Sequence, residues 1–319
     1  MGMRGTATAQ QLHKLYKQVH SRQGTYIRSF ASGPRGRSPG EQIRSPLSRL
    51  AIEGVENIIA VASGKGGVGK STTAVNLAVA LALECKLRVG LLDADVYGPS
   101  IPTLMKLSGR PQLDAESKML PLENFGVRCM SMGFLMEKDA PAVWRGPMVM
   151  SALEKLTRGT AWGKIDVLVV DMPPGTGDAQ ISISQRLPLA GAVIVSTPQD
   201  LALVDARRGV TMFQKVDVPI LGLIENMSFF KCPKCGEKTD VFGHGGAQLT
   251  AKEMNMEFLG EVPLNISIRE TSDCGTPIVA SSPESEITTA YKTIARRIDS
   301  RLKELASSDY SPGPTIIIK

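Results

Sequence analysis

One stretch of the sequence has the residue types and spacing of a phosphate-binding loop. Residues 63–72, Ser-Gly-Lys-Gly-Gly-Val-Gly-Lys-Ser-Thr, fit the pattern G-x-x-x-x-G-K-[ST]. The glycines let the backbone approach phosphate oxygens closely enough for successive N–H groups to bind them. Lys70 adds a positive charge near the β- and γ-phosphates, and Ser71 supplies a magnesium ligand. The residues predicted to bind nucleotide in this loop are Gly64, Lys65, Gly66, Gly67, Val68, Gly69, Lys70, Ser71 and Thr72.

Acidic residues follow two later strand-like segments. Asp93 and Asp95 come directly after residues 88–92, and Asp171 ends an apolar run. Ligands of open α/β sheets bind at the carboxyl ends of the strands, so we expect these acids to face the phosphates. We predict that Asp171 holds hydrated Mg²⁺ together with Ser71 and Asp93. Asp95 is a candidate to orient the attacking water or to accept its proton.

Two further segments are candidates to contact the base. Asn226 comes at the predicted end of a strand, and its amide has the donor and acceptor needed to bind an adenine edge. The alternative for Asn226 is a turn cap. Residues 261–265, which contain Pro263, follow the last predicted strand and are placed to wall the base.

A pair of cysteines indicates a metal or cluster site. Cys232 and Cys235 are separated by two residues, a spacing at which two thiolates bind one soft metal ion or one edge of an iron–sulfur cluster. The pair supplies only two of four ligands, so the others come from a second copy of the chain or from elsewhere in it. The run Lys-Cys-Pro-Lys-Cys-Gly is also typical of half a zinc ribbon, and spacing alone does not separate zinc from iron.

The elements that must position these residues alternate between strand and helix. The strand candidates are mostly apolar throughout, as expected when helices cover both faces of a parallel sheet. We predict a doubly wound, mostly parallel α/β sheet flanked by helices, in one domain over residues 52–306. The predicted strands are Ile58–Ala62, Arg88–Leu92, Gly126–Met130, Val167–Val170, Ala192–Ser196, Ile220–Ile224 and Phe258–Val262. Predicted helices include Met148–Arg158, Ala202–Val216 and Ile287–Ala306.

The first fifty residues differ in composition from the rest. They carry nine Lys or Arg against one acid, so the remaining 269 residues of this +6 chain sum to −2. Residues 1–30 have no acid and a short amphipathic pattern, which predicts a mitochondrial transit peptide cut near Phe30 and a matrix location. A basic tail without an address and a chloroplast address are the alternatives. Residues 31–51 read as a flexible linker, and residues 307–319 as a disordered tail.

Composition narrows the remaining classes of function. The hydrophobic content is 42%, and no apolar run reaches the roughly 18 residues of a membrane-spanning helix. We therefore expect no stable membrane insertion. The acidic balance of residues 51–319 gives no basic stripe, so no nucleic-acid partner is expected. Five cysteines with one close pair do not form a disulfide framework.

These motifs together resemble a known class of proteins. Residues 64–72, with the extra Lys65, are similar to the deviant Walker A loop of the ParA, MinD and nitrogenase-iron-protein class of P-loop ATPases. The resemblance implies that ATP binds here and that Lys65 reaches across a homodimer to the partner's phosphates. It implies a catalytic set of Lys65, Lys70, Asp95 and Asp171, with the two lysines neutralising developing charge and with slow hydrolysis.

The branch within that class is indicated by other residues. Residues 131–133, 144–147 and 171–178, with the late cysteine pair, resemble the Mrp/Nbp iron–sulfur cluster carriers. Cys232 and Cys235 of two chains would then hold a bridging [4Fe–4S] cluster for delivery to apo-proteins. The leader is similar to that of mitochondrial members, which makes subunits of respiratory complex I the expected acceptors. A positioning ATPase of the ParA/MinD type, and an ATPase dimer stapled by structural zinc, remain the alternatives.

Overall fold

The computed structural model describes residues 51–136 and 146–307. The predicted transit peptide, residues 31–50 of the predicted linker and residues 308–319 of the predicted tail lie outside the described residues. Two residues of the 144–147 motif lie outside them as well.

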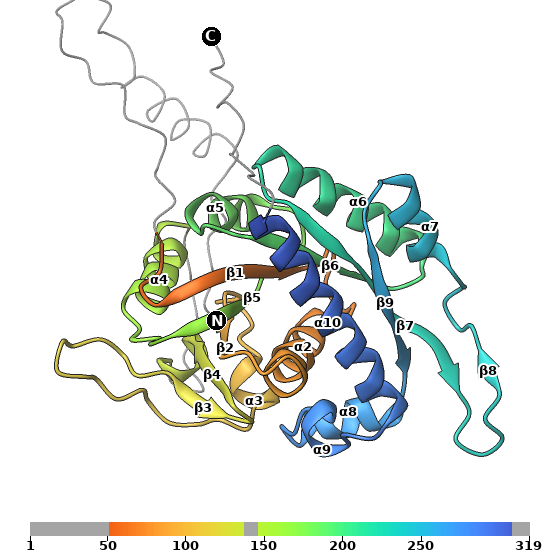
Figure 1. The fold of residues 1–319 in the computed structure, drawn as a ribbon, viewed down its shortest axis with the longest axis horizontal. Coiled ribbons are helices and arrows are strands. Elements are labelled where there is room, and N and C mark those ends of the chain that lie inside the picture. Colours follow the sequence, from red (N-terminus) through yellow and green to blue (C-terminus); the bar gives the residue numbers. More distant parts are fainter. Residues whose placement is uncertain (1–50, 137–145, 308–319) are drawn as a thin grey trace, which may run out of the picture. The chain divides into compact units, whose positions relative to one another are not determined.

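A nine-stranded sheet forms the centre of the described part of the chain, in the order β3-β4-β2-β5-β1-β6-β7-β8, with β9 also paired to β7 (Figure 1). The pairs are parallel except that β3 runs antiparallel to β4 and β8 antiparallel to β7. The strands are β1 Val55–Ala62, β2 Val89–Asp93, β3 Leu122–Asn124, β4 Val127–Ser131, β5 Ile165–Asp171, β6 Gly191–Ser196, β7 Ile220–Lys231, β8 Lys238–Thr239 and β9 Phe258–Leu264.

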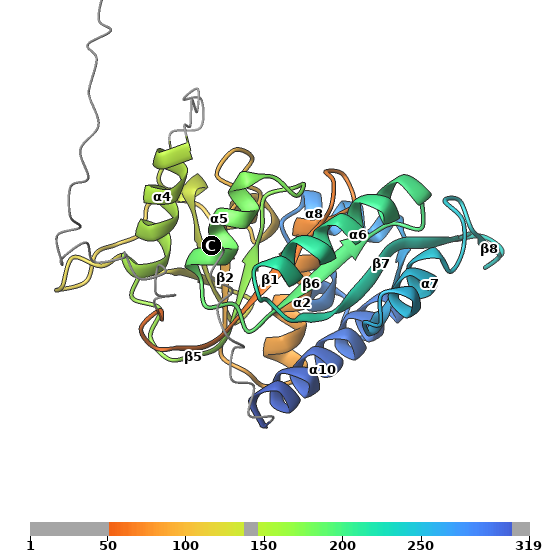
Figure 2. The same ribbon diagram turned by 90° about the horizontal axis from the view of Figure 1, so that it is seen from above.

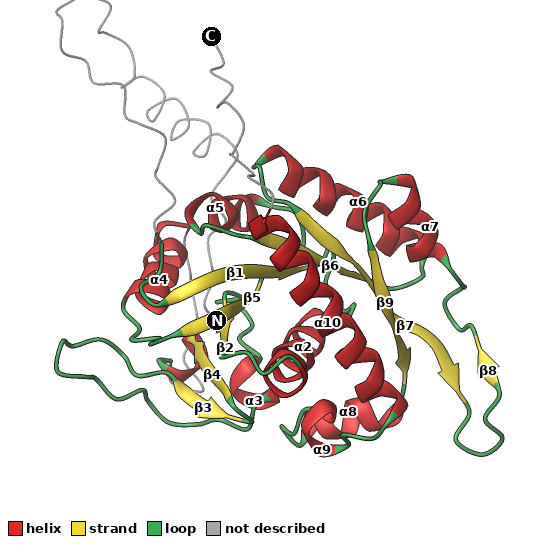
Figure 3. Ribbon diagram, in the orientation of Figure 1, coloured by secondary structure: helices red, strands yellow, loops and turns green. Residues whose placement is uncertain are grey.

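Helices cover both faces of this sheet (Figure 1, Figure 2 and Figure 3). Strand and helix mostly alternate along the chain. On one face α2 packs against α10, and on the other α4, α5 and α6 lie in a row. No helix of the described ranges is long and apolar enough to cross a membrane. The helices are α2 Lys70–Glu84, α3 Ile101–Leu104, η1 Met132–Phe134, α4 Gly146–Arg158, α5 Asp178–Arg186, α6 Asp200–Lys215, α7 Gly246–Glu253, α8 Ile266–Asp273, α9 Ile278–Ser281 and α10 Glu286–Ser307.

The register of the central strands brings the predicted acids together. β5 lies between β1 and β2, and Asp93 at the end of β2 pairs with Asp171 at the end of β5. Strands β2 and β6 are buried at every position, because both faces are covered. Two carboxylates that are buried at the same edge of the sheet need a cation or hydrogen-bond donors beside them.

All seven predicted strands are present, and the predicted α/β fold is confirmed. The short strands β3 and β8 were not predicted, since two or three residues carry no readable pattern. β7 is longer than predicted: it continues beyond Ile224 to Lys231, so Asn226 lies inside the strand rather than after it. Pro263 likewise lies within β9 instead of after its end. The prediction ended β7 too early because polar Glu225 and Asn226 follow Ile224, although both are buried inside the strand.

Candidate functional site

The glycine-rich loop joins the end of β1 to the start of α2, which is the strand–loop–helix context that the motif requires. Gly67 and Gly69 have φ of 82° and 80°, a left-handed conformation that other residues seldom adopt. Gly64 is confined by space, because a Cβ there would lie 2.2 Å from the backbone carbon of Asp205 on α6. The loop therefore follows a path that a chain without these glycines could not take.

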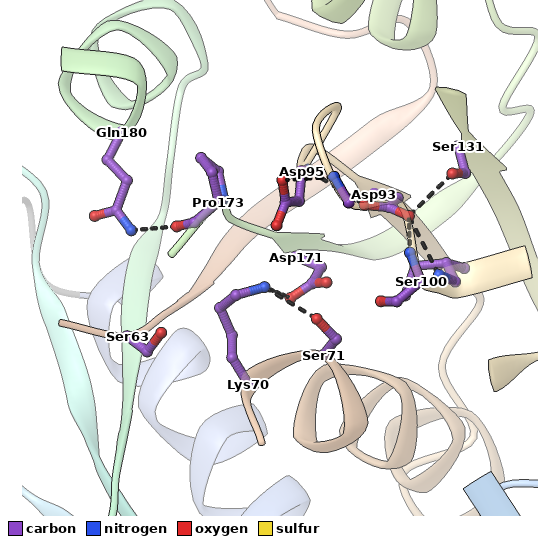
Figure 4. A network of polar contacts seen from close by, with 12 residues as sticks. Ser63, Lys70, Ser71, Asp93, Asp95, Ser100, Ser131, Asp171, Pro173 and Gln180 are labelled. Atoms are coloured by element: carbon purple, nitrogen blue, oxygen red, sulfur yellow. Dashed lines mark hydrogen bonds and ion pairs between the residues drawn. The ribbon is translucent and has the colours of Figure 1, made fainter. Parts of the chain in front are cut away.

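A buried ion pair lies at the start of α2, where the loop ends (Figure 4). The Nζ atom of Lys70 donates to Oδ1 of Asp171 at 2.5 Å and to Oγ of Ser71 at 3.1 Å. Burial raises the pKa of the Asp171 carboxyl, and the Lys70 ammonium acts against that rise. The Oδ2 atom of Asp171 is buried without a hydrogen-bond partner. A carboxylate oxygen with no partner beside a serine hydroxyl is a donor set that suits Mg²⁺.

Asp93 organises the neighbouring loop. Its Oδ2 accepts from the backbone N–H groups of Ser100 and Ile101, at 3.1 and 3.2 Å, and from Oγ of Ser131 at 2.9 Å (Figure 4). Burial, together with the negative charge of Asp171, raises the pKa of Asp93 to about 7. Through these three hydrogen bonds, Asp93 fixes the segment that follows β2. The part of Asp93 in holding Mg²⁺ stays a prediction.

Asp95 lies on the loop between β2 and α3 and is half-buried. Its Oδ1 accepts from the backbone N–H groups of Tyr97 and Gly98, both at 3.3 Å, and its own N–H donates to Asp93 at 3.2 Å. These bonds fix the loop that carries Asp95 next to the Asp93–Asp171 pair. Its role toward an attacking water stays a prediction.

The segment after Asp171 is tied to the phosphate-binding loop at one end and to α5 at the other. The N–H of Gly175, whose φ is 95°, donates to the carbonyl of Ser63 at 3.1 Å. Nε2 of Gln180 donates to the carbonyl of Pro173 at 2.5 Å, while its Oε1 is buried without a partner. Sequence reasoning missed Gln180, and the available signal was an amide in the first turn of the helix that follows the loop.

The two predicted base-contacting residues lie in different surroundings. Asn226 is 7% exposed, and its Nδ2 donates to the carbonyl of Val68 at 2.8 Å, so its amide braces the phosphate-binding loop. Pro263 lines a cavity of about 300 Å³ with Phe229 on β7 and part of α10. Contact of either residue with adenine stays a prediction.

Cys232 and Cys235 occupy the turn between β7 and β8. The turn is closed by backbone bonds of 2.9 Å from Cys232 N–H to the Glu237 carbonyl and from Gly236 N–H to the Cys232 carbonyl. Cys235 is exposed and Cys232 half-buried. Backbone N–H groups of Cys235 and Lys234 donate to the Cys232 sulfur and lower the pKa of that thiol.

The cysteine turn is incomplete as a metal site within the described residues. No group of three or more His, Cys, Asp or Glu side chains able to hold a metal ion occurs there. Cys129 is buried, and burial raises the pKa of its thiol. Burial likewise raises the pKa of half-buried Cys85, while Cys274 is exposed. The described chain therefore brings two thiols to this turn and leaves further ligands to another source.

Comparison with known families decides the assignment of the whole domain. Residues 54–299 match the family described as "ParA: NUBPL iron-transfer P-loop NTPase". The chain belongs to this NUBPL family. It is 64% identical over 258 residues to an Arabidopsis thaliana iron-sulfur protein required for NADH dehydrogenase, covering 81% of this chain and 82% of that one. It is 61% identical over 253 residues to the mouse iron-sulfur cluster transfer protein NUBPL, covering 79% of each.

More distant relatives and solved structures agree with the NUBPL assignment. An Escherichia coli iron-sulfur cluster carrier protein is 52% identical over 79% of this chain and 68% of its own. A nucleotide-binding protein from Archaeoglobus fulgidus in complex with ADP superposes with a TM-score of 0.64 at 37% identity, over 73% of this chain and 91% of that one. The cell-division ATPase MinD of Pyrococcus furiosus, with a TM-score of 0.58, 22% identity and coverage of 76% and 98%, shares the fold. The resemblance stated from the motifs is confirmed.

The buried ion pair predicts a measurable loss of stability. Lys70→Met leaves the Asp171 carboxylate buried without its partner, and we expect the free energy of unfolding at neutral pH, without nucleotide, to fall by about 3–5 kcal/mol. Burial raises the pKa of Asp171, so the folded state binds a proton more tightly than the unfolded chain does and the deficit shrinks as pH falls. Urea denaturation measures both effects.

The matched control for this change is Lys118→Met, which breaks an exposed pair with Glu53 at 2.9 Å. That variant should lose no more than about 1 kcal/mol. The double variant Lys70→Met/Asp171→Asn should recover part of the loss, since no charge is left unpaired. Equal stability of Lys70→Met and Lys118→Met would show that the buried pair contributes little.

The lowered pKa of Cys232 predicts selective reactivity in the metal-free protein. The thiolate is the reacting form, so a short pulse of iodoacetamide near neutral pH should modify half-buried Cys232 faster than exposed Cys274. Peptide mass spectrometry resolves the two sites. Faster modification of Cys274 would mean that exposure, rather than the donors around the Cys232 sulfur, controls reactivity here.

Proposed function

We propose that this protein is an ATP-dependent carrier of iron–sulfur clusters. Two chains hold a [4Fe–4S] cluster between their Cys232 and Cys235 thiolates and deliver it to apo-proteins. The observation that carries the proposal is the thiol pair at the tip of the β7–β8 hairpin, with Cys235 exposed, Cys232 half-buried and no third ligand among the described residues. The names of the relatives, which are cluster carriers and transfer proteins, support it.

The proposed assembly is a homodimer. A cluster has four irons to be held, and one chain supplies two thiolates, so a second copy completes the set most simply. Lys65 is half-buried beside Ser63, whose Oγ donates to the Lys65 carbonyl at 2.9 Å. From this loop its charge would serve the partner's nucleotide.

The residues around the loop have separate roles in the proposed nucleotide chemistry. The loop N–H groups and Lys70 bind the phosphates. Ser71, Asp93 and Asp171 would hold Mg²⁺, which polarises the phosphate oxygens when bound. Asp93 holds the neighbouring chain in place. Asp95 orients water, and Lys65 and Lys70 offset negative charge as it develops. Hydrolysis on this arrangement is slow and serves the cycle of cluster binding and release.

The acceptors that we propose are subunits of respiratory complex I, and the compartment is the mitochondrial matrix. Support comes from the Arabidopsis relative, which is required for NADH dehydrogenase and is named mitochondrial. The acid-free leader in residues 1–30 agrees with import into that organelle. Cleavage of the leader near Phe30, the linker over 31–51 and the tail over 307–319 are parts of the same proposal.

Reconstitution with iron and sulfide under anaerobic conditions tests the carrier function. We expect one cluster per two chains, and transfer of that cluster to an apo-ferredoxin, because each chain contributes two thiolates. Cys232→Ser and Cys235→Ser should each abolish stable loading. Cys274→Ser, which removes another exposed thiol, is the matched control and should load normally.

Visible absorption, Mössbauer spectra and metal analysis measure this outcome. Zinc bound tightly at half an ion per chain, which iron does not displace, would contradict the carrier function and support a zinc-stapled dimer. Loading that survives the loss of either thiol would place the cluster elsewhere in the chain.

The proposed role of Lys65 predicts that its loss weakens ATP-dependent dimerisation without preventing ATP binding. Lys70 variants would not separate these two effects. Lys65→Ala should still bind one ATP per chain but should lose ATP-dependent dimerisation by about tenfold or more, because the charge it removes serves the partner's phosphates. Sedimentation velocity with and without Mg-ATP measures the change. Lys252→Ala, an exposed lysine on α7, is the control. Unchanged pairing of Lys65→Ala would remove this lysine from the interface.

A further inference from the structure

Strand β7 connects the two candidate sites. Asn226 lies within it and contacts the phosphate-binding loop, and Cys232 follows its last residue, Lys231. Five residues separate the two, a span on the order of 20 Å along an extended strand. A single strand therefore runs from the nucleotide loop to the cysteine turn.

At the nucleotide end, the contact between strand and loop is tight. The buried Nδ2 of Asn226 donates to the carbonyl of Val68 at 2.8 Å. A Cβ on Gly69 would lie 2.2 Å from that nitrogen and 3.7 Å from Cε of Met227. The loop backbone thus rests directly on residues 226 and 227. A rearrangement of the loop around phosphate would therefore act on this part of β7.

Immediately after this contact the strand leaves regular geometry. Asn226 pairs with Val262 on β9, but the next pair is Phe230 with Leu264, so the register shifts between them. Met227 has φ of 56°, which non-glycine residues seldom adopt. Bulges of this kind redirect a strand and tend to occur beside functional sites.

At the cysteine end the strand and its turn form one unit. Phe230 and Lys231 pair with Thr239 and Lys238 of β8. Nζ of Lys238 lies 4.2 Å from the centre of the Phe229 ring, and Lys231 forms a 2.8 Å ion pair with Glu286 at the start of α10. These contacts join the cysteine turn to the end of β7, so a movement of that end would reach the turn.

We propose that Asn226 is a positioning residue that couples the state of the phosphate-binding loop to the cysteine turn through the bulge at Met227. This proposal rests on the proposed carrier function and adds how its two sites communicate. Asn226 acts on the Val68 carbonyl at one end. At the other end of β7, a shift of the strand changes how accessible the thiols of Cys232 and Cys235 are to solvent and partners.

The test compares full-length wild type and Asn226→Ala in two measurements, each with and without saturating Mg-ATP. One is the rate at which the reconstituted cluster is lost to a ferrous chelator. The other is the rate at which iodoacetamide labels Cys232 and Cys235 in the metal-free protein, resolved by peptide mass spectrometry. In wild type we expect ATP to change both rates about fivefold or more, a typical size for coupled sites. In Asn226→Ala both ratios should return to about one.

Two further variants separate coupling from general damage. Met227→Gly keeps the Asn226 amide but makes the backbone of the bulge flexible, because glycine takes many more conformations than methionine. A flexible bulge should transmit no change, so both ratios should also be about one. Asn57→Ala removes a similar amide on β1, which donates to the Asp166 carbonyl at 3.3 Å, and it should keep the wild-type ratios. Nucleotide titration and thermal unfolding confirm that each variant is folded and saturated.

The outcomes distinguish this proposal from the carrier function. The coupling would be overturned if ATP changed both rates in Asn226→Ala as much as in wild type, or if ATP changed neither rate in wild type. A cluster that still loads would leave the carrier function standing in either case. If wild type loads no cluster, the carrier function fails. The labelling of the metal-free protein still decides whether Asn226 links the two sites.

Discussion

The buried pair of Lys70 and Asp171 is the interaction on which the nucleotide site depends. Asp171 ends β5, which lies between β1 and β2, and its side chain is fully buried. A carboxylate in such a place needs a cation or hydrogen-bond donors. Lys70 supplies the cation because α2 begins directly after the glycine-rich loop. The central strand therefore determines where the loop must end, and Asp93 is held beside the pair by donors of its own.

The cysteine turn is built on the opposite principle. Its thiols are partly or fully exposed, and within residues 51–136 and 146–307 no other ligand set completes them. A structural metal site is usually closed by four ligands of one domain. In the proposed homodimer, half of the ligands come from the second chain, so the site can be assembled or opened by moving the two chains. A site that can be opened in this way suits a cluster that is passed on to another protein. A metal that stabilises the fold would not need to be released.

Much of the architecture could be predicted because the physics is local. Buried parallel strands are apolar at successive positions, so seven strands were readable, and the loop motif placed Lys70 and Ser71. The contacts that tune the site could not be read this way. Asn226 bonds to a carbonyl 158 residues away, and Gln180 bonds across a loop to Pro173. The extension of β7 was missed because polar Glu225 and Asn226 end the apolar run, whereas the fold buries both residues within the strand.

The position of the bulge matters for how one strand can serve two sites. Before it, β7 is hydrogen-bonded to β6 from Ala192 to Ser196, so that part belongs to the rigid sheet. After it, the partners are β8 and the end of β9, and the strand is tied to α10 by Lys231. Coupling between sites requires an element with more than one arrangement that both sites can bias. A strand that was paired regularly along its whole length would have only one arrangement. The bulge lets the part of β7 after Met227 turn, while the part before it keeps its pairs. Asn226 stands at the last regular pair before it, where a change in the loop acts on the strand with the sheet as support.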